Sequence, residues 1–393
     1  MIHPADRLAF DRAMVTQPVW NRFDTGADAL SLAENVLLHA GPTFPAPDQI
    51  TVPVMNSACV AAVYEGLAPD FDAAEAMIRA EEIVLKPAQD HGVVVPLAAV
   101  ISASMPLHSV YDAWRGKIRC FAPINGGIGP SLRLGLRSQA VLEHIRWLNS
   151  RVLDVLAAGI GEGIALVPLA AHGLRQGDDC HAFTPAAGAA LVREIRARRQ
   201  SAIEDEKVAA FIDASPSLFL NLWMAATKCM MKAAEGTEGA GLITAAGGNG
   251  RDVGIQVAGK PGRWFTAPAE PPIGDLGAHS PDRALGAIGD SAVVDCFGLG
   301  AMAIANAPKQ FRAMQAFLGE NPKDLSEALS LGRHPYFEGL DQGLGCSVHS
   351  IAQSERPPMI SLGVIDRKGE AGRIGGGISR LPISICRDAK EQV

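Results

Sequence analysis

The sequence has little of what marks a secreted, membrane-spanning or nucleic-acid-binding protein. No uncharged apolar run reaches about 18 residues, so we expect no membrane span. The first ten residues have neither the basic nor the apolar region of a secretory signal. The net charge of -7 argues against a nucleic-acid surface, and the basic run from Arg193 to Arg199 is explained by the solvated face of a helix.

Cysteine pairs are also missing. The 7 cysteines occur singly, at irregular spacing and without a CxxC motif. We therefore expect reduced, mostly buried thiols in a cytoplasmic protein rather than a disulfide framework. Cys180 and His181, with His172 nearby, lack any standard metal-ligand spacing, so we expect neither a metal nor a cofactor.

What the sequence does have is a large supply of aliphatic residues and turn formers. Hydrophobic residues make up 48% of the 393 positions and aromatic residues only 5%, while 41 glycines and 26 prolines indicate many tight turns. This composition favours an α+β enzyme. We predict mixed α/β parts at the two ends, residues 1–135 and 237–393, flanking a central helical domain, residues 136–236.

Hydrophobic periodicity supports this division. Apolar residues recur at helical spacing through the central part, as at Leu142, Ile145 and Leu148. The predicted helices there cover residues 138–157, 163–175, 184–199, 202–213 and 216–234.

The flanking parts are predicted to alternate between helices and short strands. Residues 1–40 have a helical pattern, and residues 53–64 and 72–82 follow as helices. Strands are expected at 83–85, 93–101, 242–245, 253–258, 263–267 and 359–364, and a hairpin at 110–121. Gly247 to Gly250 is the predicted turn between two of these strands, and further helices are expected at 309–318 and 323–331.

The stretch from Gly286 to Pro308 places polar groups against a predicted apolar core. Gly289, Asp290 and Ser291 form a polar turn, and Asp290 and Asp295 lie near the start of a predicted buried helix at residues 301–305. The N–H groups at the start of a helix suit a carboxylate, a carbonyl or a phosphate. The alternative is a glycine-rich turn in which Asp or Ser only caps the helix.

Four further segments combine polar side chains with apolar surroundings. His91 is a candidate general acid or base, although a turn histidine is equally ordinary. The sequence GGIGPS after Asn125 is not a nucleotide-binding loop, but Arg133 behind it is a candidate carboxylate clamp or a surface residue. The polar loop with Asp178 and His181 is a candidate site or a helix cap, and the remaining candidates are Ser104 and Asn249.

Several phrases occur in an order that resembles one protein family. They are HAGP at 39–42, VYEGLA at 63–68, ISASMP at 101–106, GDDCH at 177–181, FLNLWMAA at 219–226, RWFTAPA at 263–269 and IGDSA at 288–292. The sequence resembles the YlbE-like family, which includes the AllG subunit of oxamate carbamoyltransferase. The resemblance implies an oligomeric protein that acts with other subunits in carbamoyl transfer, in purine or allantoin breakdown.

The resemblance also directs attention to two departures. The family pattern has an acidic residue where Gly126 stands here, and an amide followed by a guanidinium where Ala182 and Phe183 stand. Losing polar anchors changes which substrate a site accepts. A changed substrate, or a changed reaction on the same scaffold, therefore stays open.

Three functions remain open from the sequence. The first is a carbamoyltransferase, or a subunit of one, that acts on a small amide or ureido compound with carbamoyl phosphate or phosphate. The second is a hydrolase of a small amide, imide or cyclic ureide, and the third is a non-catalytic subunit that completes a partner's active site. The candidate catalytic residues are His91, Asp178, His181 and Asp290, and the candidate substrate-binding residues are Ser104, Asn125, Arg133, Asn249 and Ser291.

Overall fold

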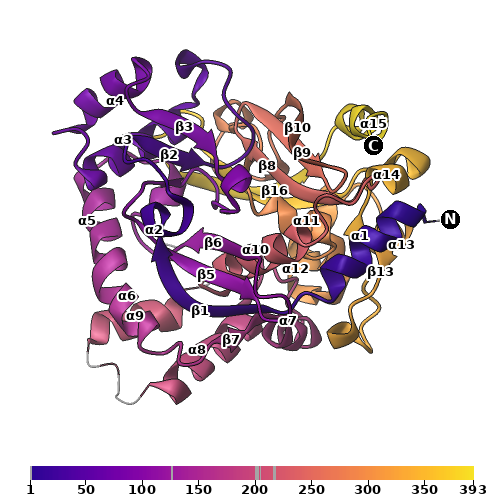
Figure 1. The fold of residues 1–393 in the computed structure, drawn as a ribbon. Helices are drawn as coiled ribbons and strands as arrows, with labels where there is room; N and C mark the ends of the chain where they lie inside the picture. Colours follow the sequence, from indigo (N-terminus) through magenta and orange to yellow (C-terminus); the bar gives the residue numbers. More distant parts are fainter. Residues whose placement is uncertain (1, 125–126, 200–202, 204, 216–217) are drawn as a thin grey trace.

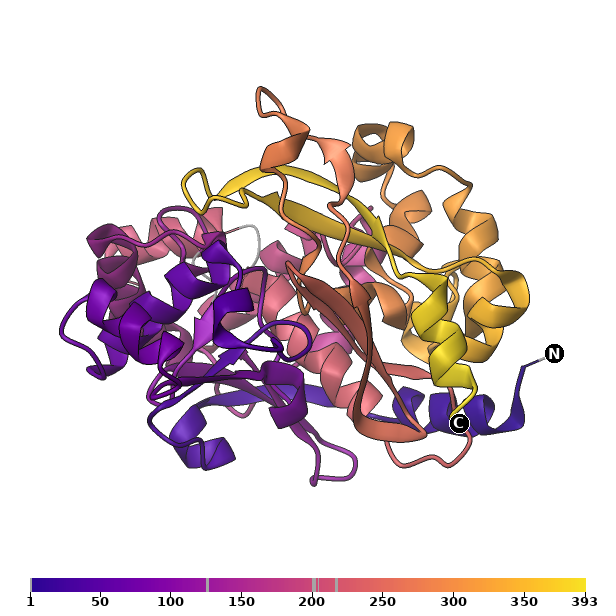
Figure 2. The same cartoon turned by 90° about the horizontal axis from the view of Figure 1, so that it is seen from above.

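The computed structural model describes residues 2–124, 127–199, 203, 205–215 and 218–393, and it has the expected α+β architecture (Figure 1). Helices alternate with several small sheets, and the two chain ends lie on the same side of the molecule in Figures 1 and 2. All seven cysteines are buried and unpaired by disulfides, as predicted.

An antiparallel sheet and one buried helix form the centre of the largest core. The sheet has the strand order β6-β5-β1-β7. The helix α10 (Leu218–Lys232) packs against β1, β5 and β6 and is buried on nearly every side, which explains why its sequence is apolar all round. The strands are β1 (Pro18–Thr25), β5 (Pro106–Asp112), β6 (Arg119–Pro123) and β7 (Ile164–Ala165).

The N-terminal part contains a second, smaller sheet in the order β3-β2-β4. Its strands β2 (Val36–His39) and β3 (Val84–Pro87) are parallel, and parallel strands need a crossover. Two helices make that crossover, α3 (Val52–Glu65) and α4 (Phe71–Arg79), close to the predicted bounds. The third strand is β4 (Val100–Ile101).

Two sequence predictions in this part are wrong. Within the predicted helical stretch 1–40, the described residues 2–40 contain helices only at α1 (Pro4–Met14) and α2 (Gly26–Leu30), because the segments between and after them pair with distant strands as β1 and β2. The expected strand at 93–101 is mostly irregular, because Pro96 lacks an amide hydrogen and Leu97 has a φ of 48°.

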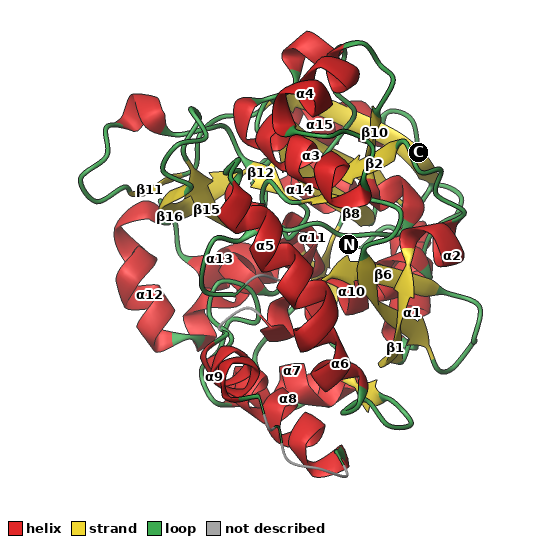
Figure 3. Ribbon diagram, turned by 90° about the vertical axis from the view of Figure 1, so that its left-hand side faces the viewer, coloured by secondary structure: helices red, strands yellow, loops and turns green. Residues whose placement is uncertain are grey.

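The central part follows the predicted helices closely. They are α5 (Gln139–Trp147), α6 (Leu153–Ala157), α7 (Leu166–Arg175), α8 (Pro185–Arg198), α9 (Glu206–Ala214) and α10. Figure 3 shows α5 across one face of the molecule, with β11 (Ile273–Asp275), β16 (Arg373–Arg380) and α12 (Pro308–Met314) on one side of it and β1 and β6 on the other. The largest core draws on residues from all three predicted segments, so the proposed division into domains stays a prediction.

Among the described residues, a test of helix length and apolar composition finds no single helix able to cross a membrane. The bent pair α9 and α10 passes that test by length and composition only.

The C-terminal part contains two antiparallel sheets and a short hairpin, seen from above in Figure 2. The strands are β8 (Ile243–Asn249), β9 (Asp252–Val257), β10 (Lys260–Pro268), β11 (Ile273–Asp275), β12 (Ile288–Gly289), β13 (Ser330–Gly332), β14 (Leu344–Cys346), β15 (Met359–Ile365) and β16 (Arg373–Arg380). The helices are α11 (Ala292–Phe297), the 3-10 helix η6 (Gly300–Asn306), α12 (Pro308–Met314), α13 (Pro322–Leu329), α14 (Val348–Ser354) and α15 (Ile383–Lys390).

The predicted hairpin between β8 and β9 is present, but its turn lies later than expected. β8 continues to Asn249, and the chain reverses at Gly250 and Arg251, with a φ of 86° at Gly250. The side-chain oxygen of Asn249 accepts hydrogen bonds from the amides of Arg251 and Asp252 at 3.0 and 2.8 Å. An asparagine that binds the backbone two residues ahead is a turn-forming device.

The buried carboxylate of Asp290 joins the N-terminal part to the C-terminal part. Its Oδ1 accepts hydrogen bonds from the Gly41 amide at 2.9 Å and the Gln89 side chain at 2.8 Å, and its Oδ2 accepts from the Val95 amide at 3.0 Å. Burial raises the pKa of Asp290 to about 7, while these hydrogen bonds favour the ionised form.

We predict that Asp290→Ala lowers the free energy of unfolding by about 3 kcal/mol or more, since each buried donor left without a partner costs roughly 1–3 kcal/mol. Urea unfolding followed by circular dichroism measures the loss. The exposed Asp48 provides the control, because Asp48→Ala should change stability by no more than about 0.5 kcal/mol. Equal urea midpoints for the two variants would contradict the role of Asp290.

Candidate functional site

A polar cleft of about 240 Å³ is lined by residues of the N-terminal, central and C-terminal parts, and it contains three of the predicted site residues, Arg133, His181 and Ser291. Its walls come from many elements that are distant in sequence. They are the segment around Pro96, the loop after α7, the start of α11, and parts of α10, α12, β15 and β16. A cleft of this size suits a small molecule.

The strongest chemical feature of the cleft is a hydrogen-bonded pair of His181 and Asp295. The His181 Nδ1 lies 2.7 Å from Asp295 Oδ2, and both side chains are buried. The other carboxylate oxygen accepts from the amides of Ala301 at 2.8 Å and Ser361 at 3.2 Å. A carboxylate can only accept, so Nδ1 donates. Among the described residues none bonds to Nε2, which remains available to a ligand.

The loop before His181 fixes the direction of the imidazole. Oδ1 of the buried Asp179 accepts hydrogen bonds from the amides of His181 at 2.7 Å and Phe183 at 2.9 Å. Burial alone lowers the pKa of His181, but the charge and hydrogen bond of Asp295, with Asp179 added, outweigh it and raise that pKa above its usual 6.5. Such a histidine can take up a proton near neutral pH.

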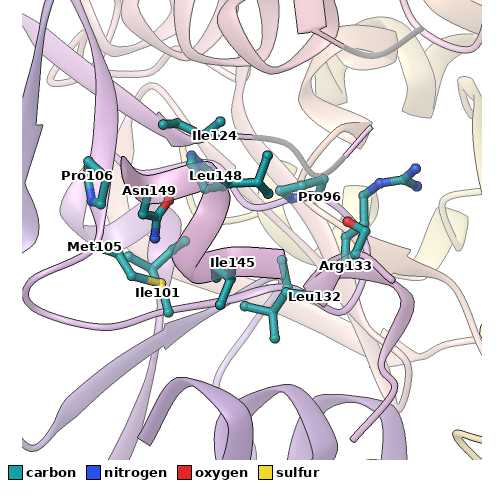
Figure 4. Close-up of a pocket in the computed structure, with 13 residues that line it drawn as sticks. Pro96, Ile101, Met105, Pro106, Ile124, Leu132, Arg133, Ile145, Leu148 and Asn149 are labelled. Carbon is teal, nitrogen blue, oxygen red and sulfur yellow. The ribbon is translucent and has the colours of Figure 1, made fainter. Parts of the chain in front are cut away.

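Two guanidinium groups supply positive charge to the same cleft. Arg133 separates the cleft from a small apolar cavity, and Figure 4 shows its guanidinium pointing away from the side chains of Ile145 and Leu148. Burial, and then the charge of Arg373, lower the pKa of Arg133 to about 10. Arg373 lies at the more exposed rim, where partial desolvation lowers its pKa as well.

Both guanidinium groups are oriented by carbonyl groups rather than by carboxylates. Arg133 Nη2 donates to the Gly127 carbonyl at 2.9 Å, and Arg373 Nε donates to the Gly375 carbonyl at 2.8 Å. Among the described residues neither arginine forms an ion pair, and Arg133 Nε has no hydrogen-bond partner. Their charges are therefore left for a bound anion, which a guanidinium binds through two parallel hydrogen bonds.

Two hydroxyl groups also belong to the polar lining, together with Gln310. Ser291 begins the turn before α11, and Ser361 lies on β15. The Ser361 hydroxyl is buried without a partner among the described residues, which is unusual for a buried polar group. Sequence reasoning missed Ser361 and Arg373 as site residues. The only local signal was an arginine inside a run of glycines, which also fits a surface strand.

The other predicted site residues that the structure describes lie outside the cleft. Asp178 accepts from the amides of Ala186 and Ala187 at 3.2 and 2.8 Å and thus caps α8, while the exposed Ser104 bonds to Glu65. Asp290 and Asn249 hold the backbone together as described above. His91 is half-buried outside the cleft, and burial lowers its pKa. Asn125 lies outside the described residues.

These features define an α+β protein with a cationic, histidine-containing site for a small molecule. A family model described as oxamate carbamoyltransferase subunit AllG matches residues 83–291. The chain is 32% identical over 372 residues to the oxamate carbamoyltransferase subunit AllG of Escherichia coli (strain K12), across 90% of this chain and 88% of that protein. The chain belongs to the AllG family, which confirms the resemblance seen in the sequence.

Two further comparisons show similarity across nearly the whole chain. The uncharacterized protein YahG of the same organism is 30% identical over 411 residues, across 99% of this chain and 85% of that protein. A crystal structure of a conserved protein of unknown function from Enterococcus faecalis V583 matches with a TM-score of 0.92 at 26% identity. It covers 99% of this chain and 96% of that chain, so the whole fold is shared.

We predict that Asp295→Asn lowers the pKa of His181, because burial then acts without the opposing carboxylate charge. In the folded wild-type chain, His181 keeps its proton to higher pH than it does in the unfolded chain. This stabilisation is fully present below pH 6.5 and is lost as the pH rises through the raised pKa of His181. Asp295→Asn should therefore lower the free energy of unfolding most below pH 6.5. Histidine NMR titration measures the pKa, and an unchanged value would contradict the pairing.

Proposed function

We propose that this chain is a carbamoyltransferase subunit that binds a small anionic substrate in the cleft. The observation that carries the proposal is the convergence of the His181–Asp295 pair with Arg133 and Arg373 in one cleft. Membership of the AllG family supports the reaction class, because the relative of known name is a subunit of oxamate carbamoyltransferase. We further propose that the chain acts with partner subunits, in the cytoplasm and in nitrogen or purine catabolism.

The chemistry that the cleft supports is proton removal beside a bound anion. In carbamoyl transfer from carbamoyl phosphate, an acceptor nitrogen attacks the carbamoyl carbon, a C–N bond forms, and the C–O bond to phosphate breaks. His181 Nε2 takes the proton that the nitrogen loses, and Asp295 stabilises the resulting imidazolium. The guanidinium groups of Arg133 and Arg373 hold the anionic group of donor or acceptor while charge develops.

The acceptor proposed is a small amide with a carboxylate, of the oxamate type. Ala182 lines the cleft next to His181, at a position where the family resemblance implies an amide side chain. Its methyl group leaves the base and both arginines in place but removes a hydrogen-bonding group from the wall. We therefore infer that the acceptor makes fewer polar contacts on that side than oxamate itself requires.

We predict that Arg133→Met and Arg373→Met each weaken phosphate and oxamate binding about tenfold or more, because a lost charge-assisted hydrogen bond contributes about 1.5–3 kcal/mol. Isothermal titration calorimetry measures the dissociation constants. The exposed Arg22, which pairs with Asp24, provides the control as Arg22→Met. Binding that the two cleft variants leave unchanged would place the anion site elsewhere.

A second prediction concerns turnover. In the assembly with its partner subunits, His181→Ala should lower kcat about 100-fold or more, since general base catalysis contributes roughly 10²–10⁴. His91→Ala, at a half-buried histidine outside the cleft, is the control and should keep the wild-type rate. Release of product without an acceptor amide would favour the hydrolase, and wild-type turnover by His181→Ala would favour a non-catalytic subunit.

A further inference from the structure

A second convergence of titratable side chains lies where the first helix meets the C-terminal part. His3 precedes α1, Asp6 lies in the first turn of that helix, and His349 is the second residue of α14. Figure 1 shows α1 beside α13 and α14, although more than three hundred residues separate these segments. One ligand atom from each of the three side chains lies within 4.8 Å of the other two. None of the three lines the cleft.

Asp6 is the buried centre of this cluster. Its Oδ1 accepts a hydrogen bond from the Gly241 amide at 2.6 Å, and its Oδ2 accepts from the Ser347 hydroxyl and from His349 Nδ1, the latter at 2.9 Å. In the described part of the chain, His349 is its ion-pair partner and no lysine or arginine joins them. A buried carboxylate is costly unless a positive charge balances it, and a neutral histidine does not supply one.

His3 closes the cluster on its open side. Its imidazole stacks on that of His349, with ring centroids 4.3 Å apart and an interplanar angle of 19°. His3 is exposed, and this stacking is the contact that its side chain makes among the described residues. Two imidazoles and one carboxylate are a typical donor set for zinc and neighbouring divalent metals, and an exposed third ligand gives the ion a route into the site.

We propose that His3, Asp6 and His349 bind one divalent transition-metal ion of the zinc type, which joins α1 to α14. The ion takes the place of the proton between His349 Nδ1 and Asp6 Oδ2, and water fills the fourth position of a tetrahedral site. Two ligands of a tetrahedral zinc ion, each about 2.1 Å from it, lie about 3.4 Å apart, so ligand atoms up to 4.8 Å apart must close by on the order of 1–1.5 Å. A turn of the exposed His3 ring provides that movement.

The site has a structural consequence rather than a catalytic one. Gly241 and Ser347 already hold the Asp6 carboxylate in position, as groups behind a metal ligand commonly do. A bound ion would fix the start of the chain to α14 and stabilise the folded state, because an ion that binds only the folded chain raises its apparent stability. Its ligands must be deprotonated, so binding weakens as the pH falls.

Cobalt titration of the full-length chain, after removal of metals with a chelator, tests the proposal. Wild-type protein should reach saturation at one equivalent of Co²⁺ and develop the visible absorption of a tetrahedral site, and Zn²⁺ should displace the cobalt. His3→Ala should weaken cobalt binding about tenfold or more, because it removes one of three protein ligands. His279→Ala, at another exposed histidine, is the matched control and should bind cobalt as the wild type does.

Thermal unfolding provides the second measurement. Without metal, His3→Ala should unfold at the wild-type temperature, because it leaves the contact between Asp6 and His349 intact. With excess Zn²⁺, the unfolding temperature should rise for the wild type and for His279→Ala but not for His3→Ala. Wild-type affinity of His3→Ala for cobalt, or a titration without saturation at one equivalent, would overturn the proposed site.

Discussion

Two buried carboxylates, one just before α11 and one within it, hold together the parts of the chain from which the cleft is built. Asp290, before the helix, accepts hydrogen bonds from Gly41, Gln89 and Val95 and so fixes the N-terminal part. Asp295, near its end, accepts from His181 and from the amide of Ser361 and so fixes the central loop and β15. A helix of six residues thereby sets the positions of segments far apart in sequence.

Asp290 and Asp295 differ in the groups that their carboxylate oxygens bind. Both oxygens of Asp290 accept hydrogen bonds from two backbone amides and the Gln89 side chain, and Asp290 does not line the cleft. Asp295 uses one oxygen for two backbone amides and keeps the other for an imidazole that reaches the cleft. Arg133 and Arg373 likewise bond to backbone carbonyl groups, which orient them without cancelling their charge. This arrangement supports the proposed anion site, because the charges are positioned before an anion binds.

The sequence predicts helices and hairpins well, because their hydrophobic patterns come from residues close together in the chain. The helices of the central part, the crossover helices α3 and α4, and the hairpin of β5 and β6 lie close to their expected positions. β1 and β2 could not be foreseen, because their strand character comes from pairing with β5 and β3. Similarly, His181 and Asp295 are 114 positions apart, and no spacing rule connects them. Asp178 has the sequence context of a site residue, yet its carboxylate caps a helix.

The distribution of polar groups in the cleft bears on how a relative of AllG can change its substrate. His181, Asp295, Arg133 and Arg373 come from the loop after α7, from α11, from the 3-10 helix Leu132–Leu134 and from β16. Their positions therefore depend on the whole fold, which a TM-score of 0.92 shows to be shared with the crystal structure from Enterococcus faecalis V583. Ala182 depends on none of these contacts, because its side chain only covers one wall of the cleft. Under the proposed function, substitution at such a position changes hydrogen bonding to the substrate while the proposed base and anion site keep their geometry. Selectivity and reaction type can therefore evolve separately on this scaffold.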